Sequence, residues 1–139
     1  MNADEVKKLG WNCVDFVYVS GDSYVDHPSF GAAIITRLLE DCGYRVAFLA
    51  QPDWRSNSDF MQFGKPRLGF FVSAGNIDSM VAHYTVAKRK RSDDAYTAGG
   101  KNGHRPDRAV TVYSNILRKL YPDSPIIIGG LEASLRRFA

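Results

Sequence analysis

Four short apolar runs divide the chain, and they predict the strands of a sheet. The runs cover residues 14–19, 46–50, 68–72 and 126–128. They are rich in β-branched and aromatic residues, are bounded by Gly, Pro, Asp or Ser, and are nearly continuous instead of alternating. Continuous runs of this kind are typical of strands buried on both faces of a parallel sheet. We therefore expect four parallel strands with both faces covered.

Apolar residues at helical spacing lie between these runs and predict three helices. The first stripe lies between Pro28 and Gly43, residues that readily start and stop a helix. The third is preceded by Asp107, whose carboxylate can cap the first free amides. Residues 56–64 predict only a turn or two of helix. The stripes consist of Phe30, Ile34, Leu38 and Cys42; of Ile77, Met80, Val81 and Tyr84; and of Val110, Tyr113, Ile116, Leu117 and Leu120.

The alternation of strands and helices predicts an α/β fold with an open, doubly wound parallel sheet of about four strands, Rossmann-like or flavodoxin-like, with right-handed crossovers. Residues 1–12 form a lead segment and residues 13–139 the domain, with a long basic loop at 88–107. The last predicted helix begins near Glu132 and has room for barely two turns. We therefore expect the chain to be an excerpt from a longer protein.

Length and composition narrow the class of protein. A chain of 139 residues suits one domain with a sizeable core. No apolar run approaches the ~20 residues that span a bilayer, and the N-terminus lacks the apolar stretch of a signal peptide, so we expect a cytoplasmic protein without membrane contact. Cys13 and Cys42 lie 29 positions apart, which excludes a four-thiolate zinc site and a closely spaced redox pair. We expect both to be reduced or buried thiols.

The charge is concentrated in one segment. The chain has a net charge of +3, but residues 88–108 alone hold seven positive and three negative side chains, which leaves −1 on the rest. This segment can contact RNA or another acidic partner, with Tyr96 and His104 stacking on bases. The alternative is a solvated helix end that Asp93 and Asp94 partly neutralise. The candidate basic patch consists of Lys88, Arg89, Lys90, Arg91, Lys101 and Arg105.

The residues that follow the predicted strands are the candidates for a site. Ligands of open parallel sheets bind beyond the carboxyl ends of the strands. Small and polar residues gather there, although any turn after a strand favours such residues for backbone reasons. Glu132 would repel an anion at the last helix unless it acts as a cap. The candidate ligand or interdomain surface consists of Gly21, Asp22, Asp26, His27, Asp53, Ser73, Asn76, Gly129, Gly130 and Glu132.

Known signatures are missing from these turns. A single Gly21 follows the first strand, so the three-glycine dinucleotide fingerprint is absent. Lys101 in the run at 99–103 is not followed by Ser or Thr, which excludes a triphosphate loop. The three histidines have no metal-ligand spacing, and we expect neither a metal site nor a catalytic residue in this chain.

Longer strings carry a family resemblance. GDSYVDHPSFGAAI, GYRVAFLAQPDW, SAGNIDSMVAHYT, DAYTAGG, RPDRA and IGGLEASLRR, from about residue 9 onward, resemble the N-terminal portion of the YgiQ-type radical S-adenosylmethionine (SAM) proteins. The resemblance implies an iron-sulfur enzyme of uncharacterised substrate, several times longer than this chain. In it, a Rossmann-like domain similar to cobalamin-binding domains precedes a radical barrel. Three barrel cysteines, spaced Cys-x3-Cys-x2-Cys, hold a 4Fe-4S cluster that binds SAM.

The resemblance transfers a domain identity and no cofactor. With two cysteines the chain cannot hold that cluster, so 4Fe-4S and SAM are expected only in the longer parent. Cobalamin domains use Asp-x-His-x-x-Gly after the first strand, whereas Asp26 and His27 are adjacent and Gly31 lies one residue too far along. Ser73 lacks the leucine of the Ser-x-Leu motif, and only Gly129 and Gly130 match. We expect a cobalamin-like fold that does not bind cobalamin through His27.

Two functions follow as hypotheses. The first is a noncatalytic N-terminal module of a radical SAM enzyme, which packs on the downstream barrel and helps to form its active-site entrance. The second is a binding module that recruits RNA or another acidic partner through residues 88–108.

Overall fold

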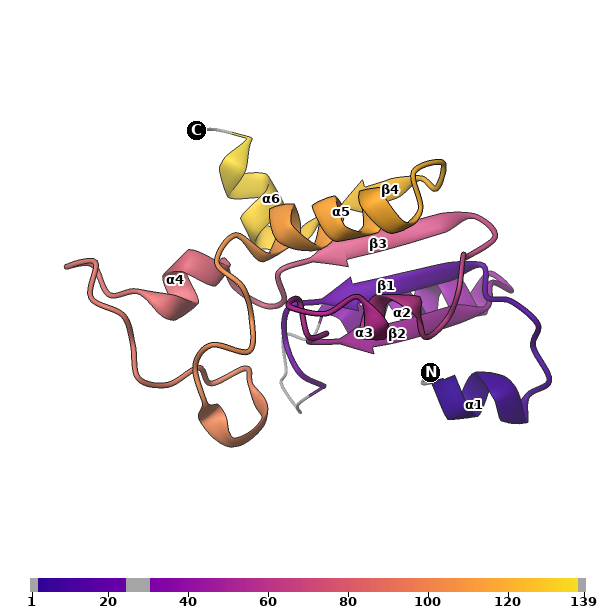
Figure 1. Ribbon diagram of the computed structural model, residues 1–139, viewed down its shortest axis with the longest axis horizontal. Coiled ribbons are helices and arrows are strands. Elements are labelled where there is room, and N and C mark those ends of the chain that lie inside the picture. Colours follow the sequence, from indigo (N-terminus) through magenta and orange to yellow (C-terminus); the bar gives the residue numbers. More distant parts are fainter. Residues whose placement is uncertain (1–2, 25–30, 138–139) are drawn as a thin grey trace.

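A computed structural model describes residues 3–24 and 31–137, in which the predicted alternation of strands and helices is present (Figure 1). The first strand begins two residues later than expected, the third one residue later, and the other two match their predicted bounds. The elements are α1 (Ala3–Lys8), β1 (Phe16–Ser20), α2 (Gly31–Asp41), β2 (Val46–Ala50), α3 (Ser58–Met61), β3 (Gly69–Ser73), α4 (Ser79–His83), the 3-10 turn η1 (Ala98–Gly100), α5 (Ala109–Leu120), β4 (Ile126–Ile128) and α6 (Gly130–Arg136).

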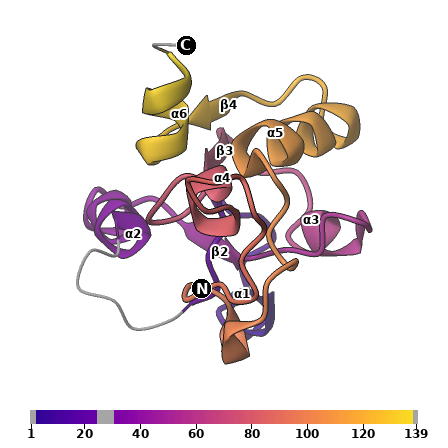
Figure 2. The same ribbon diagram turned by 90° about the vertical axis from the view of Figure 1, so that its left-hand side faces the viewer.

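The four strands form one parallel sheet in the order β2-β1-β3-β4, which confirms the predicted open α/β fold. Viewed along the strands, α2 lies on one side of the sheet, and α3 and α5 lie on the other (Figure 2). The strand order reverses at β1, because β2 pairs with one side of it and β3 with the other. In sheets of this kind the crevice at the carboxyl ends of the two central strands is where ligands bind.

Two apolar layers hold the helices to the sheet. The larger lies under α3 and α5, where Phe60 and Tyr113 pack on Phe70 and Val72. The smaller lies under α2 and is mainly aromatic, with Tyr18 at its centre. Within α5, Val110, Tyr113 and Leu117 are buried, so the predicted stripe of this helix is confirmed.

The stripe predicted for α2 is wrong in its described part, and its first residue, Phe30, lies outside the described residues. Ile34 and Leu38 are exposed, and the helix instead packs through Ala32 and Leu39. The small Ala32 lets the helix approach the aromatic layer closely, which rotates the larger aliphatic side chains toward solvent. Both candidate faces have helical spacing, so periodicity alone does not choose between them.

The stripe predicted for α4 is also wrong. This helix has only five residues, and it buries Ser79, Ala82 and His83 while Val81 is exposed. Asp78 caps its start, because its carboxylate accepts hydrogen bonds from the amides of the second and third helical residues. Polar contacts, described below, hold the inner face of α4.

The strand β4 departs from the expectation of four strands covered on both faces. Ile127 and Ile128 are 47% and 56% exposed. The strand is at the edge of the sheet, and among the described residues it pairs only with β3.

Cys13 and Cys42 are free thiols, as expected, and both are exposed rather than buried. Across residues 3–24 and 31–137, no helix is long and apolar enough to cross a membrane.

Candidate functional site

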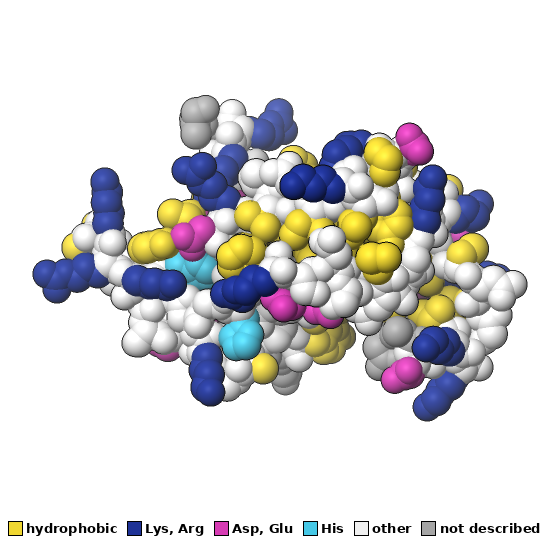
Figure 3. Space-filling view, viewed as in Figure 1, with side chains coloured by type: hydrophobic (Ala, Val, Ile, Leu, Met, Phe, Trp, Pro, Cys, Tyr) yellow, Lys and Arg dark blue, Asp and Glu magenta, His cyan; other side chains and the backbone are white. Residues whose placement is uncertain are grey.

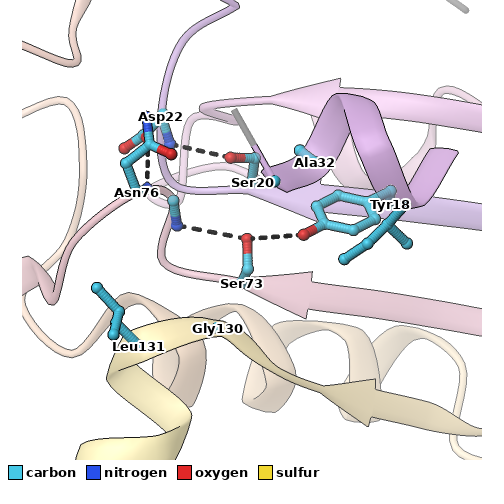
Figure 4. A pocket seen from close by; sticks show the side chains of 11 residues that line it. Tyr18, Ser20, Asp22, Ala32, Ser73, Asn76, Gly130 and Leu131 are labelled. Atoms are coloured by element: carbon cyan, nitrogen blue, oxygen red, sulfur yellow. Dashed lines mark hydrogen bonds between the residues drawn. The ribbon is translucent and has the colours of Figure 1, made fainter. Parts of the chain in front are cut away.

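A cavity of about 190 Å³ lies at the carboxyl ends of β1 and β3, where the strand order reverses (Figure 4). Of the predicted surface residues, Asp22, Ser73, Asn76 and Gly130 line this cavity. The turn after β4 thus lies beside the turns after β1 and β3, as the sequence predicts. The other lining residues are Tyr18, Ser20, Gly31, Ala32, Ile35, Gly75 and Leu131.

Two hydroxyl groups that line the pocket, those of Tyr18 and Ser73, are hydrogen-bonded to each other. The Tyr18 hydroxyl donates a hydrogen bond to Ser73 Oγ at 3.2 Å, and the Gly75 amide donates to the same oxygen at 3.3 Å (Figure 4). Burial raises the pKa of Tyr18, and the bond to Ser73 offsets only part of this effect. The phenol therefore stays protonated at neutral pH and serves the pocket as a hydrogen-bonding group.

Asp22 is fully buried, and its carboxylate is engaged on both oxygens. Its Oδ2 accepts a hydrogen bond from the backbone amide of Asn76 at 2.6 Å, and its Oδ1 accepts one from the Arg105 side chain at 2.7 Å. A side chain at Gly75 would overlap the Asp22 carboxylate, and Gly75 also has a φ of +103°. Glycine is therefore required at position 75 for the carboxylate to occupy this place.

Arg105 is a buried ion-pair partner and is not part of the basic patch, which corrects the prediction for this residue. Its side chain donates to Asp22 and, through the other nitrogen, to both oxygens of Asp94 at 2.8 and 2.7 Å. We call Asp22, Asp94 and Arg105 the arginine clamp. A guanidinium group can bridge two carboxylates because its donors form a planar fork. The clamp binds a loop residue to the end of β1.

Two further contacts tie the loop to the turns after β1 and β2. The amide and the hydroxyl of Ser23 both donate to the Tyr96 carbonyl, at 3.0 and 2.9 Å. The Gln51 side-chain amide donates to Thr97 Oγ1 at 2.7 Å and to the Gly21 carbonyl at 3.1 Å. The base of the loop is therefore part of the carboxyl-end structure.

Asp107 does not cap α5, which corrects a second prediction. Its Oδ1 lies 2.6 Å from His83 Nδ1, and its Oδ2 accepts from the Tyr84 hydroxyl at 2.7 Å. Burial raises the pKa of Asp107, but the hydrogen bonds from His83 and Tyr84 outweigh this effect and lower it. Asp107 therefore links α4 to the start of α5 as a carboxylate.

Glu132 is buried and joins three helices. Its Oε1 accepts from the Val110 amide at 2.9 Å, and its Oε2 accepts from the Ser79 amide at 2.9 Å and the Ser79 hydroxyl at 2.5 Å. It lies in the first turn of α6 and caps the starts of α4 and α5, two places where a negative charge is favoured. The sequence allowed Glu132 to cap its own helix, whereas the carboxylate caps two other helices and α6 has no side-chain cap.

The pocket lining does not include four described residues of the predicted surface, namely Gly21, Asp53, Gly129 and Glu132. Asp53 is exposed and accepts from the Arg55 amide. Gly129 donates its amide to Val72, and Gly21 packs its Cα against the Ala74 carbonyl. Asp26 and His27 lie outside the described residues.

Comparison with known protein families identifies the family of this domain. The family model described as "Radical SAM N-terminal" matches residues 1–139. The chain belongs to this family. The resemblance seen in the sequence is therefore confirmed over the whole chain.

Relatives show that the radical SAM N-terminal domain is part of longer proteins. The chain is 56% identical to a UPF0313 protein of Thermotoga petrophila over 136 residues, which is 98% of this chain and 24% of the relative. It is 58% identical to a UPF0313 protein of Clostridium botulinum over 139 residues, which is all of this chain and 22% of the relative. The chain thus spans about a quarter of the curated relatives it matches. No solved structure matches it.

The residues of this domain do not fit the iron-sulfur cluster that its family implies. A 4Fe-4S cluster needs thiolate ligands. The chain has two cysteines, Cys13 and Cys42, which are too few to hold such a cluster. The described residues hold no group of three or more His, Cys, Asp or Glu side chains placed to bind a metal ion.

The rest of the predicted basic patch is exposed. Lys88, Arg89, Lys90, Arg91 and Lys101 all face solvent. The loop that follows α4 extends beyond the carboxyl ends of the strands, and basic side chains project from that end of the molecule (Figures 1 and 3). This surface is separate from the pocket, because none of these side chains lines it.

Sequence reasoning missed Tyr18 and Leu131 as pocket residues and gave Asp94 a different role. Tyr18 is a polar aromatic residue within an apolar strand run, which was a usable signal. Leu131 directly follows the glycine pair and could have been found from its position. Asp94 was expected to neutralise part of a solvated basic run, whereas it is buried and pairs with Arg105.

Proposed function

We propose that this domain is a noncatalytic module of a radical SAM enzyme, that it packs against the barrel of the same polypeptide, and that its pocket helps to form the entrance to the active site. The full protein would hold the 4Fe-4S cluster and SAM in the barrel. The two exposed free thiols favour a reducing compartment, and we place the protein in the cytoplasm.

The engagement of Asp22 carries the noncatalytic part of this proposal. Among the described residues that line the pocket, Asp22 is the one carboxylate, and Arg105 and Asn76 occupy both its oxygens. Among the described residues, the lining includes no Lys, Arg, His or Cys side chain. A general acid or base must be able to exchange a proton with the reacting atom. The Asp22 carboxylate is instead held by its hydrogen bonds to Arg105 and Asn76.

The mouth of the pocket supports the packing part. Leu131 lines the pocket and is 54% exposed. A neighbouring domain can pack on Leu131 beside the cavity, because burial of this exposed side chain would stabilise the contact.

A split-protein experiment tests the packing. The 139-residue chain and the remainder of the full protein would be produced separately and mixed, and the complex measured by size-exclusion chromatography. Leu131→Asp should abolish the complex. Met61→Asp, a matched change on α3 at a side chain of 56% exposure, should leave it intact. A complex unaffected by Leu131→Asp, or no complex of the unmodified parts, would contradict the proposal.

Activity of the full protein tests the noncatalytic role. Tyr18→Phe and Ser73→Ala each remove one pocket hydroxyl with little change in shape. SAM consumption by the cluster-loaded protein should stay within about tenfold of the unmodified protein, because general acid–base groups typically contribute 10²–10⁴-fold. A loss of 10²-fold or more with an unchanged melting temperature would identify a catalytic pocket.

The exposed basic run supports a second candidate function, recruitment of RNA or another acidic partner. Its test is titration of labelled RNA at two salt concentrations, since phosphate contacts weaken as salt rises. The double variant Arg89→Gln and Lys90→Gln should lower the affinity. The double variant Lys7→Gln and Lys8→Gln makes the same charge change on α1 and should have little effect. Equal effects of the two pairs would contradict this function.

A further inference from the structure

The outer edge of β4 is apolar and, within the described residues, unpaired. Ile127 and Ile128 are about half exposed, and Leu131 and Leu135 of α6 are exposed to a similar degree. We call these four residues the β4–α6 margin. Exposed edge strands with apolar side chains are avoided in finished sheets, because they present a template for pairing with another strand.

The backbone of β4 has hydrogen-bonding groups that point outward. Pro125 accepts from Phe70, and Gly129 donates to Val72, which ties both ends of β4 to β3. Hydrogen bonding alternates along a parallel strand. The amide of Ile127 therefore faces β3, and the amide of Ile128 faces away from it.

The opposite edge of the sheet is built differently. In β2, Val46, Ala47 and Leu49 are buried, whereas β4 exposes two of its three residues. The edge of the sheet that leaves apolar side chains exposed is therefore β4 and not β2. The strand order also points there, since the doubly wound order 2-1-3-4 extends to 2-1-3-4-5 by adding a strand beside the fourth.

The longer relatives have further polypeptide beyond the matched part, which is a source for an additional strand at this edge. The matched domain is their radical SAM N-terminal part by description and less than a quarter of their length. α6 follows β4 directly, and a helix after a strand leads the chain back toward the start of a parallel neighbour. The next strand along the polypeptide is therefore well placed to reach β4.

We infer that the first strand beyond residue 139 of the full protein pairs in parallel with β4 as a fifth strand and covers Ile127 and Ile128. The β4–α6 margin is then an internal seam of the full protein. This inference depends on the length of the relatives and on the edge geometry, and it does not depend on the role proposed for the pocket.

Hydrogen exchange of single amides in the full protein tests the pairing. The amide of Ile127 is the internal control, because it faces β3 with or without a fifth strand. If the fifth strand is present, the amide of Ile128 exchanges as slowly as that of Ile127, roughly 10²-fold or more below the rate of an open amide. Fast exchange at Ile128 together with slow exchange at Ile127 would overturn the inference.

A pair of variants separates strand pairing from burial under another element. In the full protein, Ile128→Pro removes the outward amide, whereas Ile128→Ala keeps it and shortens the side chain. Because proline is tolerated at strand edges but not inside a sheet, Ile128→Pro should lower the melting temperature much more than Ile128→Ala. Equal effects of the two variants would overturn the pairing even if the Ile128 amide exchanges slowly. Leu131 belongs to both the margin and the pocket, so the complex that Leu131→Asp tests is not used here. The two Ile128 measurements leave Leu131 unchanged and bear on the strand pairing alone, whereas the activity of Tyr18→Phe and Ser73→Ala bears on the pocket alone.

Discussion

The arginine clamp buries charged side chains, whereas the β4–α6 margin exposes apolar ones. Arg105 and Asp22 are charged, yet they are 1% and 0% exposed. Ile127 and Ile128 are apolar, yet about half of each side chain faces solvent. The clamp is a finished structure, because each buried charge meets an opposite charge with direct hydrogen bonds. The margin is unfinished, because its apolar surface meets no partner among the described residues.

The difference shows where this domain is self-sufficient. Buried ion pairs rarely increase stability over apolar packing, but the loss of one partner is costly, so they hold a specific arrangement. At the carboxyl ends this arrangement fixes the loop and the pocket. The margin contributes little to the stability of the chain alone, and its apolar surface is available to the rest of the polypeptide.

The largest expected effect is that of breaking the clamp. Arg105→Ala leaves Asp22 and Asp94 buried without their cation, and we expect a loss of about 3–5 kcal/mol in the free energy of unfolding. The measurement is urea unfolding of the chain. Lys101→Ala, an exposed change in the same loop, should stay within about 0.5 kcal/mol. If the two variants lose similar amounts, the clamp does not hold the fold.

A methyl group at position 75 tests how tightly the clamp is seated. Gly75→Ala combines a positive φ with overlap of the Asp22 carboxylate, and we expect a loss of about 2–4 kcal/mol from strain and overpacking together. Gly99→Ala is the matched control, because its φ is also positive, +71°, but its Cβ would meet nothing within 4 Å. The control should lose only about 1–2 kcal/mol. Equal losses in urea unfolding would show that Asp22 moves aside freely.

The helix junction under Glu132 gives a smaller effect. Glu132→Gln replaces one accepting oxygen with an amide that faces donors from Ser79 or Val110, and we expect a loss of about 2 kcal/mol. Glu40→Gln changes a half-buried glutamate that pairs at 3.8 Å with the exposed Arg37, where an ion pair contributes little. Thermal unfolding should separate the two variants. A neutral Glu132→Gln would mean that the caps of α4 and α5 are dispensable.

Much of the fold could be predicted from the sequence, because continuous β-branched runs have few alternatives to a buried parallel strand. The strand ends also located part of the pocket, since the carboxyl ends of parallel strands must meet at one edge. Ser73, Asn76 and Gly130 came together for this reason. The burial of β4 was predicted wrongly, because its run of three isoleucines looks the same whether a fifth strand is present or not.

The clamp could not be predicted, because it depends on tertiary contacts. Arg105 lies in a charged, glycine-containing segment, and nothing local separates it from the exposed Lys101. Its partner Asp22 is 83 residues away. The face of α2 that packs on the sheet likewise depends on the contact of Ala32 with Tyr18. The periodicity of the sequence does not reveal this contact.

The exposed stripe of α2 gives the smallest expected effect and tests whether exposed apolar residues are idle in this chain. Leu38 is 63% exposed, so Leu38→Ala should change the free energy of unfolding by no more than about 0.5 kcal/mol. Leu39, the next residue, packs against the sheet, and Leu39→Ala should lose about 1–3 kcal/mol because burial of a leucine is worth that much. Both variants would be measured by urea unfolding. If Leu38→Ala lost as much as Leu39→Ala, the exposed stripe would be covered in solution, and the contrast between a finished interior and an unpartnered apolar surface would fail for this helix.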